Sequence, residues 1–567
     1  MSRDGEAVPD QTAEVLGPET RLFPESDPVL FSRSLLRSLR AAARKPLGVG
    51  LVTAKTLLGT VRVTTATAAR AAGIDATGPA DGASDRRFDD PAWEHNPLFY
   101  FVRQTYGVLG DAFTDLIELG DTDSVTEEKS RVYAQLLVDA ASPTNFLPTN
   151  PVALKQAFDT GGISLLRGAR NLVSDVVHNR GMPQQVDRSA FELGTDLAAT
   201  AGKVVFHNEL MEVLQYEPRT ETVHDTPLLL SPPWINKYYI MDLAPGRSFV
   251  EWAVEHGHTV FAISYRDPDE SMRDVSLEDY LIDGPRAAMD VVAEITGADR
   301  VNLVGLCLGG LMTALLAAYL HAEGDERVHT LTLFNTLLDF EEPGPLGTFT
   351  DEETIERLER KMARRGYLEG SEMRGTFDVL RANDLVFNYV VSNWLLGQDP
   401  PAFDILAWNE DSTRMPAQMH SFYLRAFYLE NRFAREELEL AGRSLRPADI
   451  TEDVFLVAAI NDHIAPWKSS YTSTQLLGGD VEYVLTSSGH IAGIVNPPSP
   501  KAYYWHHDHY PEDPEDWLAA ASRVEGSWWE RWAEWISERA GGQVPPPPMG
   551  SEKHPPAGDA PGTYVHG

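Results

Sequence analysis

The 567-residue chain has a single cysteine, Cys307, so an internal disulfide is excluded. Its first residues, MSRDGE, lack the basic and then apolar pattern of a secretory signal, and a reducing cytoplasm is the predicted compartment. Basic side chains are scarce: 48 Lys and Arg stand against 84 Asp and Glu, which gives a formal net charge of -36. Such a surface repels phosphate backbones, so no nucleic-acid partner is expected.

One uncharged stretch, residues 301–320, has the length of a membrane span. It contains Asn302 and the glycines Gly305, Gly309 and Gly310. Its first residues favour a strand, whereas those after Gly310 favour a helix. We therefore interpret it as a buried strand, a tight turn and a buried helix, and we expect no transmembrane span.

The composition predicts four parts of the chain. Residues 1–95 form a variable basic segment and a linker, since residues 28–74 carry no acidic side chain and residues 73–90 are rich in Gly, Ala, Asp and Ser. The basic segment favours an amphipathic helix, which either lies on an anionic or lipidic surface or packs on its own protein. A helical N-terminal domain is expected at 96–215, an α/β catalytic domain at 216–540, and a flexible Pro/Gly-rich tail at 541–567.

From about residue 225, short apolar runs alternate with helical stretches. The runs are unbroken, as in parallel strands buried on both faces, and they are residues 228–230, 259–264, 301–304, 330–334, 454–458 and 482–485. This pattern predicts an α/β fold with a mostly parallel, doubly covered sheet. The long interval before the fifth run predicts a mostly helical cap insertion at about 341–447. Its many aromatic residues fit either a lid over an apolar substrate or the insertion's own core.

The only cysteine lies in Gly305-Leu306-Cys307-Leu308-Gly309-Gly310, after a predicted strand and before a predicted helix. This is the nucleophile elbow G-x-S-x-G of α/β-hydrolases, with Cys in place of Ser. Small flanking residues permit the strained turn that exposes the side chain, and a helix N-terminus favours the thiolate. A free cysteine in apolar sequence is usually inert, but this context predicts a nucleophile.

A nucleophile needs a base and an orienting acid, which in this fold follow it in the order acid, then base. Asp462 follows the fifth strand-like run, and His490 follows the sixth in a glycine-flanked loop. We therefore predict His490 as the general base and Asp462 as its orienter. Two alternatives stay open, namely Asp339 as the acid and His463 as the base.

The oxyanion hole is expected to use two backbone N–H groups. Leu308, directly after the nucleophile, supplies one, and the loop 231–236 supplies the other. Prolines 232 and 233 cannot donate, which leaves Ile235.

Two other clusters receive plainer interpretations. Residues 506–509 (HHDH) could bind a metal, but contiguous ligands seldom converge on one ion. We therefore interpret them as a solvated loop. No metal or cofactor is expected, since the sequence has no phosphate loop, dinucleotide fingerprint or paired-cysteine motif. The tryptophans at 528, 529, 532 and 535 recur at helical spacing and are expected to pack a final helix on the sheet.

The cysteine itself favours transfer of an acyl group from a thioester, because attack by a thiol replaces one thioester with another of similar energy. Longer blocks of the chain, spread over residues 96–535, resemble polyhydroxyalkanoate synthases, the polyester polymerases of bacterial storage granules. The blocks are SPTNFLPTNPVALKQAFDTGG (142–162), SPPWINKYYIMDL (231–243), AISYRDPD (262–269), GLCLGG (305–310), NYVVSNWLLGQDPPAFDILAWNEDSTRMP (388–416), NDHIAPW (461–467) and SSGHIAGIVNPP (487–498). The chain is most similar to the single-component, short-chain (class I) type.

This resemblance implies a function and a set of roles. The family's catalytic Cys, Asp and His fall on Cys307, Asp462 and His490. The implied reaction is polymerisation of 3-hydroxyacyl-CoA, such as 3-hydroxybutyryl-CoA, with release of CoA and without a cofactor. A cytoplasmic homodimer at the granule surface is also implied, and with one cysteine per chain a polymer passed between two thiols would need the second subunit.

Three points stay open at this stage. Asp462 could orient His490 or activate the 3-hydroxyl directly. An acyl-CoA thioesterase or esterase of the same fold would use the same three residues. A non-catalytic granule-associated scaffold would keep the fold without the chemistry.

Overall fold

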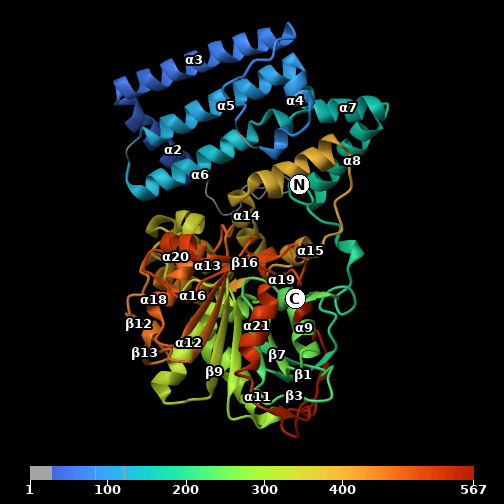
Figure 1. Ribbon diagram of the computed structural model, residues 1–567, viewed down its shortest axis with the longest axis vertical. Helices are drawn as coiled ribbons and strands as arrows, with labels where there is room; N and C mark the ends of the chain where they lie inside the picture. Colours follow the sequence, from blue (N-terminus) through green and yellow to red (C-terminus); the bar gives the residue numbers. More distant parts are fainter. Residues whose placement is uncertain (1–27, 83–84, 121) are drawn as a thin grey trace, which may run out of the picture. The chain divides into compact units, whose positions relative to one another are not determined.

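A computed structural model describes residues 28–82, 85–120 and 122–567. The chain divides into two compact units (Figure 1). The first, which we call the helical unit, comprises Met1–Asp187 and Arg374–Ala402. The second, the sheet unit, comprises Arg188–Met373 and Phe403–Gly567.

The sheet unit contains the predicted parallel strands. They are β4 (Leu228–Ser231), β7 (Val260–Tyr265), β8 (Val301–Leu306), β9 (Val328–Phe334), β14 (Asp453–Ala459) and β15 (Val481–Thr486), which lie in the order β15-β14-β9-β8-β4-β7. Every neighbouring pair among them is parallel. The prediction of a mostly parallel sheet from unbroken apolar runs is therefore confirmed.

Antiparallel strands extend this sheet at both edges, which the sequence did not predict. β16 (Tyr503–His506) and β17 (Ser522–Glu525) lie beyond β15, whereas β2 (Met211–Tyr216), β1 (Gly202–His207) and β19 (Gly558–Asp559) lie beyond β7. β1 and all but the last residue of β2 fall within residues 96–215, where the sequence predicts a helical domain. That boundary is corrected here, because the sheet unit begins at Arg188. β2 was missed because Glu212 and Gln215 interrupt its apolar pattern, although both are buried.

The C-terminal segment is folded, contrary to the expectation of a flexible tail. β18 (Gln543–Val544) pairs with β3 (Val223–His224), and β19 pairs with β1. The backbone N–H of Tyr564 donates to Glu212 Oε2 (3.0 Å), and the Tyr564 hydroxyl donates to the Asn208 carbonyl (2.7 Å). Prolines remove some donors from this segment, but the residues between them still pair with the sheet.

The uncharged stretch 301–320 forms β8, a turn at Cys307 and the buried helix α12 (Leu308–Glu323), as predicted. Across the described residues, we find no helix with the length and apolarity that crossing a membrane requires. The predicted final helix is α21 (Trp528–Ser537), which lies beside the sheet (Figure 1). Its four tryptophans are buried. Trp532 Nε1, for example, donates to Thr332 Oγ1 of β9 (2.9 Å).

The helical unit contains the long helices α2 (Pro28–Ala43), α3 (Pro46–Ala71), α5 (Pro97–Glu118), α6 (Ser124–Ala140) and α8 (Ile163–His178), with the shorter α4 (Ala92–His95) and α7 (Pro151–Asp159) (Figure 1). Local sequence sets several of their starts: the Asn96, Asp123 and Asn150 side chains cap the helices that follow them. Leu35 of the basic segment packs in a buried cluster with Ile117 and Ala134. The α2 part of the basic segment thus packs on its own protein, while α3 leaves several leucines exposed.

The expected cap insertion, 341–447, is mostly helical but belongs to both units. Residues 374–402, which include most of α14 (Gly370–Leu380), cluster with the helical unit. Within that unit, Trp394 Nε1 donates to Asp175 Oδ2 of α8 (2.7 Å). The remainder, with α13 (Glu352–Arg365), α15 (Asp404–Glu410) and α16 (Ala417–Tyr423), belongs to the sheet unit. The single cap is corrected accordingly.

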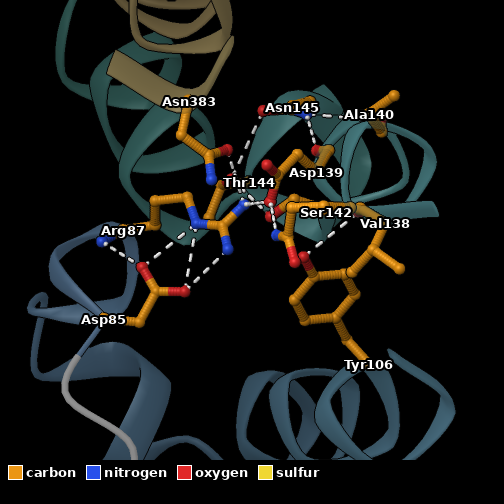
Figure 2. Close-up of polar contacts among 11 residues, drawn as sticks. Asp85, Arg87, Tyr106, Val138, Asp139, Ala140, Ser142, Thr144, Asn145 and Asn383 are labelled. Carbon is orange, nitrogen blue, oxygen red and sulfur yellow. Dashed lines mark hydrogen bonds and ion pairs between the residues drawn. The ribbon is translucent and has the colours of Figure 1, made fainter. Parts of the chain in front are cut away.

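A polar network joins distant segments of the helical unit (Figure 2). The Arg87 guanidinium donates to both carboxylate oxygens of Asp85, to Asp139 Oδ1 (3.3 Å) and to Asn383 Oδ1 (2.8 Å). Burial raises the pKa of Asp139, and Asn383 and Arg87 oppose that rise. The network therefore balances a half-buried cation with carboxylates and links residues 374–402 to α6.

Candidate active site

Cys307 lies at the turn between β8 and α12, where the elbow motif predicted it. Its backbone has φ 53° and ψ −115°, a conformation that non-glycine residues rarely adopt. The Cys307 N–H donates to the Phe334 carbonyl at the end of β9 (2.7 Å), which holds the turn against the neighbouring strand. Strain of this kind persists where surrounding structure enforces it, and it is common at active sites.

Three glycines make the turn possible. A Cβ on Gly305 would lie 2.5 Å from the Gly309 carbonyl oxygen, and one on Gly309 would lie 2.0 Å from the Ser231 carbonyl oxygen. A Cβ on Gly310 would lie 1.9 Å from Thr336 Oγ1. No side chain fits at these positions, so the sequence G-L-C-L-G-G reflects close backbone approach on both sides of the cysteine.

Asp462 and His490 are brought together by the loops after β14 and β15. His490 Nδ1 and Asp462 Oδ2 are 2.6 Å apart, and both residues are buried. Asp462 Oδ1 accepts hydrogen bonds from the N–H groups of Ile464 (2.8 Å) and Ala465 (2.9 Å). The carboxylate is thus fixed by its own loop and orients the imidazole through its second oxygen.

The charge state of His490 depends on both neighbours. Burial by itself lowers the pKa of the imidazole, but the charges of Asp462 and Cys307, together with hydrogen bonds to both, raise that pKa to about 10. Since Nδ1 faces Asp462, the contact with Cys307 uses Nε2. The predicted base therefore faces both Asp462 and Cys307.

The alternative acid, Asp339, lies elsewhere. Its Oδ1 accepts hydrogen bonds from Asn431 Nδ2 (2.7 Å) and from the Glu341 N–H (2.8 Å). The Asn431 amide oxygen in turn accepts the Phe340 N–H (2.9 Å). Asp339 therefore shapes the loop after β9, and the carboxylate bonded to His490 is that of Asp462.

The predicted oxyanion donors lie on two segments that meet at the elbow. Leu308 begins α12, and the first N–H groups of a helix have no intrahelical acceptor. Ile235 follows β4 and is fixed by its carbonyl, which accepts the Thr413 N–H (3.1 Å). The contact of Gly309 with Ser231 brings the β4 loop against the elbow.

Two tyrosines, Tyr423 and Tyr428, lie near enough to the cysteine to feel its charge, and the sequence did not single them out as site residues. Tyr423 contacts Trp234 edge-on (ring centroids 5.5 Å apart) and Tyr428 in the same way (5.6 Å). Burial raises the pKa of both phenols, and the charge of Cys307 adds to the rise. The only available signal was the aromatic richness of the insertion, which fits a lid and a core equally well.

The segment that follows His490 is held by the final helix. Trp528 Nε1 donates to the Gly493 carbonyl (2.8 Å), and Trp529 Nε1 donates to the Ile494 carbonyl (2.8 Å). The tryptophans of α21 thus brace the histidine loop as well as the sheet. His506, in the HHDH segment, lies in β16, and no group of three or more metal-binding side chains occurs in the part of the chain that the structure describes.

The fold and the elbow define an α/β-hydrolase, and residues 243–497 match the alpha/beta hydrolase fold family. Residues 84–253 match the N-terminus of poly-beta-hydroxybutyrate polymerase (PhaC). The chain is 43% identical to the poly(3-hydroxyalkanoate) polymerase subunit PhaC of Rhizobium meliloti, over 85% of this chain and 79% of that one. It is 44% identical to the Methylorubrum extorquens polymerase (85% and 80% covered) and 41% identical to subunit PhaC of Cupriavidus necator (87% and 84%). The chain belongs to the poly(3-hydroxyalkanoate) polymerase family.

Among solved structures, the monoacylglycerol lipase of Paleococcus ferrophilus aligns with 58% of this chain and 99% of its own, at 14% identity and a TM-score of 0.33. The Bacillus subtilis carboxylesterase CesB aligns with 59% and 94%, at 13% identity and a TM-score of 0.28.

Proposed function

We propose that this protein polymerises 3-hydroxyacyl-CoA into polyester, with Cys307 as the acyl-carrying nucleophile. The observation that carries this proposal is the site itself: the only cysteine lies in a strained elbow beside the Asp462–His490 pair, in a chain of the poly(3-hydroxyalkanoate) polymerase family. His490 Nε2 takes the thiol proton, and Cys307 Sγ attacks the thioester carbonyl. The Cys–acyl bond forms, the bond to CoA breaks, and CoA leaves as the thiol with the proton from His490.

Chain growth uses the same base on a hydroxyl. His490 removes the proton from the 3-hydroxyl of one acyl unit, and that oxygen attacks the thioester carbonyl of a second unit. An ester bond forms, and the thiol that leaves takes back the proton. The N–H groups of Leu308 and Ile235 stabilise the oxyanion in both steps.

Asp462 acts by orienting His490 rather than as the base for the 3-hydroxyl. Both of its oxygens already accept hydrogen bonds, from His490 and from the Ile464 and Ala465 N–H groups. These bonds hold Oδ1 in its own loop and direct Oδ2 at the imidazole, which is the geometry of an orienting carboxylate.

The proposal is tested with purified protein and 3-hydroxybutyryl-CoA. Free CoA is followed with a thiol reagent, and the acyl product is tested for sedimentation as polymer. We expect CoA release with insoluble polyester, and loss of both in Cys307→Ala. Release with soluble 3-hydroxybutyrate would identify a thioesterase instead, and activity retained in Cys307→Ala would rule out the nucleophile.

We also propose that the protein works at the surface of polyester granules, which α3 contacts. Leu47, Leu51 and Leu58 recur at helical spacing on α3 and are 87%, 73% and 67% exposed. Residues 28–74 contain no acidic side chain, and Lys55, which lies between Leu51 and Leu58, pairs with Asp115 of α5. Replacing all three by Gln should release the enzyme from granules in cell fractionation, while CoA release from soluble substrate stays intact. Granule binding unchanged in the triple variant would contradict the role of α3.

A homodimer is the remaining part of the proposal. Its support is that each chain has one thiol, so transfer of a growing polymer between two thiols requires a second subunit. Sedimentation equilibrium with substrate should give twice the mass of 62.7 kDa. A monomer that is fully active would exclude transfer between two thiols.

A further inference from the structure

The residues directly after β9 contact both proposed catalytic loops. β9 lies between β8, which ends at the elbow, and β14, which precedes Asp462. Phe334 accepts the Cys307 N–H, and Thr336 Oγ1 lies 3.3 Å from the Cys307 carbonyl oxygen. Asn335, between these two residues, is fully buried. The nucleophile is therefore held by the two neighbours of Asn335.

Asn335 itself reaches the histidine. Its Nδ2 donates to the His490 carbonyl, and its backbone N–H donates to the Val457 carbonyl of β14 (2.7 Å). Its backbone has φ 45°, in the left-handed region that Asn tolerates better than most residues. This conformation turns the chain sharply at the end of β9, between the strands that precede Cys307 and Asp462.

We infer that Asn335 is a positioning residue for the acyl transfer, which fixes the backbone of His490 relative to Cys307. This inference rests on the proposed function, because it assigns to Asn335 the placement of the proposed base. Asp462 holds the imidazole from its Nδ1 side, but a ring held at one end can still shift with its loop. The Asn335 hydrogen bond holds the other end, at the peptide carbonyl. Displacement of a catalytic group by about 1 Å costs on the order of 100-fold in rate.

The principal variant is Asn335→Gly, which keeps the left-handed backbone and removes only the amide. We expect kcat for CoA release to fall about 10- to 100-fold with KM nearly unchanged. The matched control is Asn431→Gly, since Asn431 is also buried, has φ 51°, and donates and accepts side-chain hydrogen bonds, but bonds to Asp339 and Phe340. If the two variants lose melting temperature and kcat alike, Asn335 is merely structural and the inference is wrong.

A second variant, Asn335→Asp, tests the donated hydrogen bond directly. An ionised carboxylate cannot donate to the His490 carbonyl, whereas a protonated carboxyl can. The ratio of variant to wild-type kcat, measured on folded protein, should therefore rise as the pH is lowered. A ratio that does not change with pH would contradict the inference.

The cysteine provides a readout that separates this inference from the proposed function. Because the chain has one cysteine, alkylation by iodoacetamide at pH 7 reports only on Cys307. We expect His490→Gln and Asn335→Gly both to slow alkylation, since each weakens proton removal from the thiol. If His490→Gln does not slow it, the proposed base is wrong. If His490→Gln slows it and Asn335→Gly does not, only the positioning role fails.

Discussion

At the scale of single residues, His258 is buried without the partners that an imidazole needs. It is 1% exposed, and neither ring nitrogen has a hydrogen-bond partner among the described residues. Its ring stacks on His224 (centroids 4.6 Å apart) and lies 5.7 Å from the ring of Trp532. Burial, and then the charges of His224 and His256, lower the pKa of His258 to about 3. The native state therefore keeps this imidazole neutral.

This lowered pKa predicts a pH-dependent loss of stability. An unfolded histidine has a pKa of about 6.5, so between pH 6.5 and 3 the unfolded chain binds a proton that the native state does not. Titration of His258 therefore leaves the free energy of unfolding unchanged well above pH 6.5. As the pH falls below that value the free energy of unfolding decreases, by about 2 kcal/mol between pH 7 and 5. His258→Phe keeps the ring and removes both unpaired nitrogens. We expect its free energy of unfolding, measured by urea titration, to exceed that of the wild type increasingly from pH 7 to pH 5.

His207→Phe adds the same ring at an exposed site of the sheet unit that does not act on His258, and it serves as the control. Parallel pH curves for the wild type and His258→Phe would show that His258 does not contribute.

The candidate site could be predicted from sequence only where motif and chain order mark a residue. Cys307 stood in an elbow pattern, and Asp462 and His490 followed strand-like runs, so their positions at one edge of a parallel sheet were predictable. Asn335 lies in no motif that the sequence reveals, because its proposed role depends on a hydrogen bond to His490, which is distant in the sequence. Tyr423 and Tyr428 were likewise hidden among other aromatic residues of the insertion.

At the scale of elements, α8 and residues 390–395 lie in close backbone contact at Gly168 of α8. A Cβ on Gly168 would lie 1.9 Å from the Trp394 carbonyl oxygen and 2.7 Å from its carbonyl carbon. These are backbone atoms and cannot rotate away, so α8 or its partner must move. Gly168→Ala should therefore destabilise the helical unit by about 2 kcal/mol or more, seen as a lower melting temperature in circular dichroism.

Gly50, on the exposed side of α3, provides the opposite case. Its added Cβ would meet no heavy atom within 4 Å, so Gly50→Ala should raise stability by up to about 1 kcal/mol through helix propensity. Shifts of the same sign in both alanine variants would refute the packing argument.

Elements were predictable where burial alone determines them. The six parallel strands and α12 are apolar because both faces are covered, which leaves an unbroken pattern in the sequence. The edge strands β16 and β17, and the terminal strands β18 and β19, are short and partly polar. They form because an existing sheet edge pairs with them, a cause that local sequence does not show.

At the scale of the whole molecule, the C-terminal segment satisfies buried polar groups more than 300 residues away in the sequence. Gln215 Nε2 donates to the Pro548 carbonyl (2.9 Å), and Gln215 Oε1 accepts the Gly550 N–H (2.7 Å). Glu212 accepts the Tyr564 N–H and the Thr563 hydroxyl (2.6 Å). Glu212 and Gln215, which interrupt the apolar pattern of β2, thus form these hydrogen bonds with the C-terminal segment.

Removing residues 541–567 should therefore destabilise the sheet unit. Glu212 is 4% exposed with the segment in place, and the truncation removes the hydrogen bonds that Thr563 and Tyr564 donate to its carboxylate. Loss of hydrogen bonds to a buried charge costs about 1.5–3 kcal/mol each, so we expect a fall of at least 3 kcal/mol, on the order of two such bonds, in urea unfolding. A synthetic peptide of residues 541–567 should restore stability in proportion to the logarithm of its concentration. A peptide of residues 541–562 keeps β18 and β19 but lacks the partners of Glu212, so it should restore less. Equal rescue by both peptides would mean that strand pairing, and not the buried carboxylate, binds the segment to the sheet.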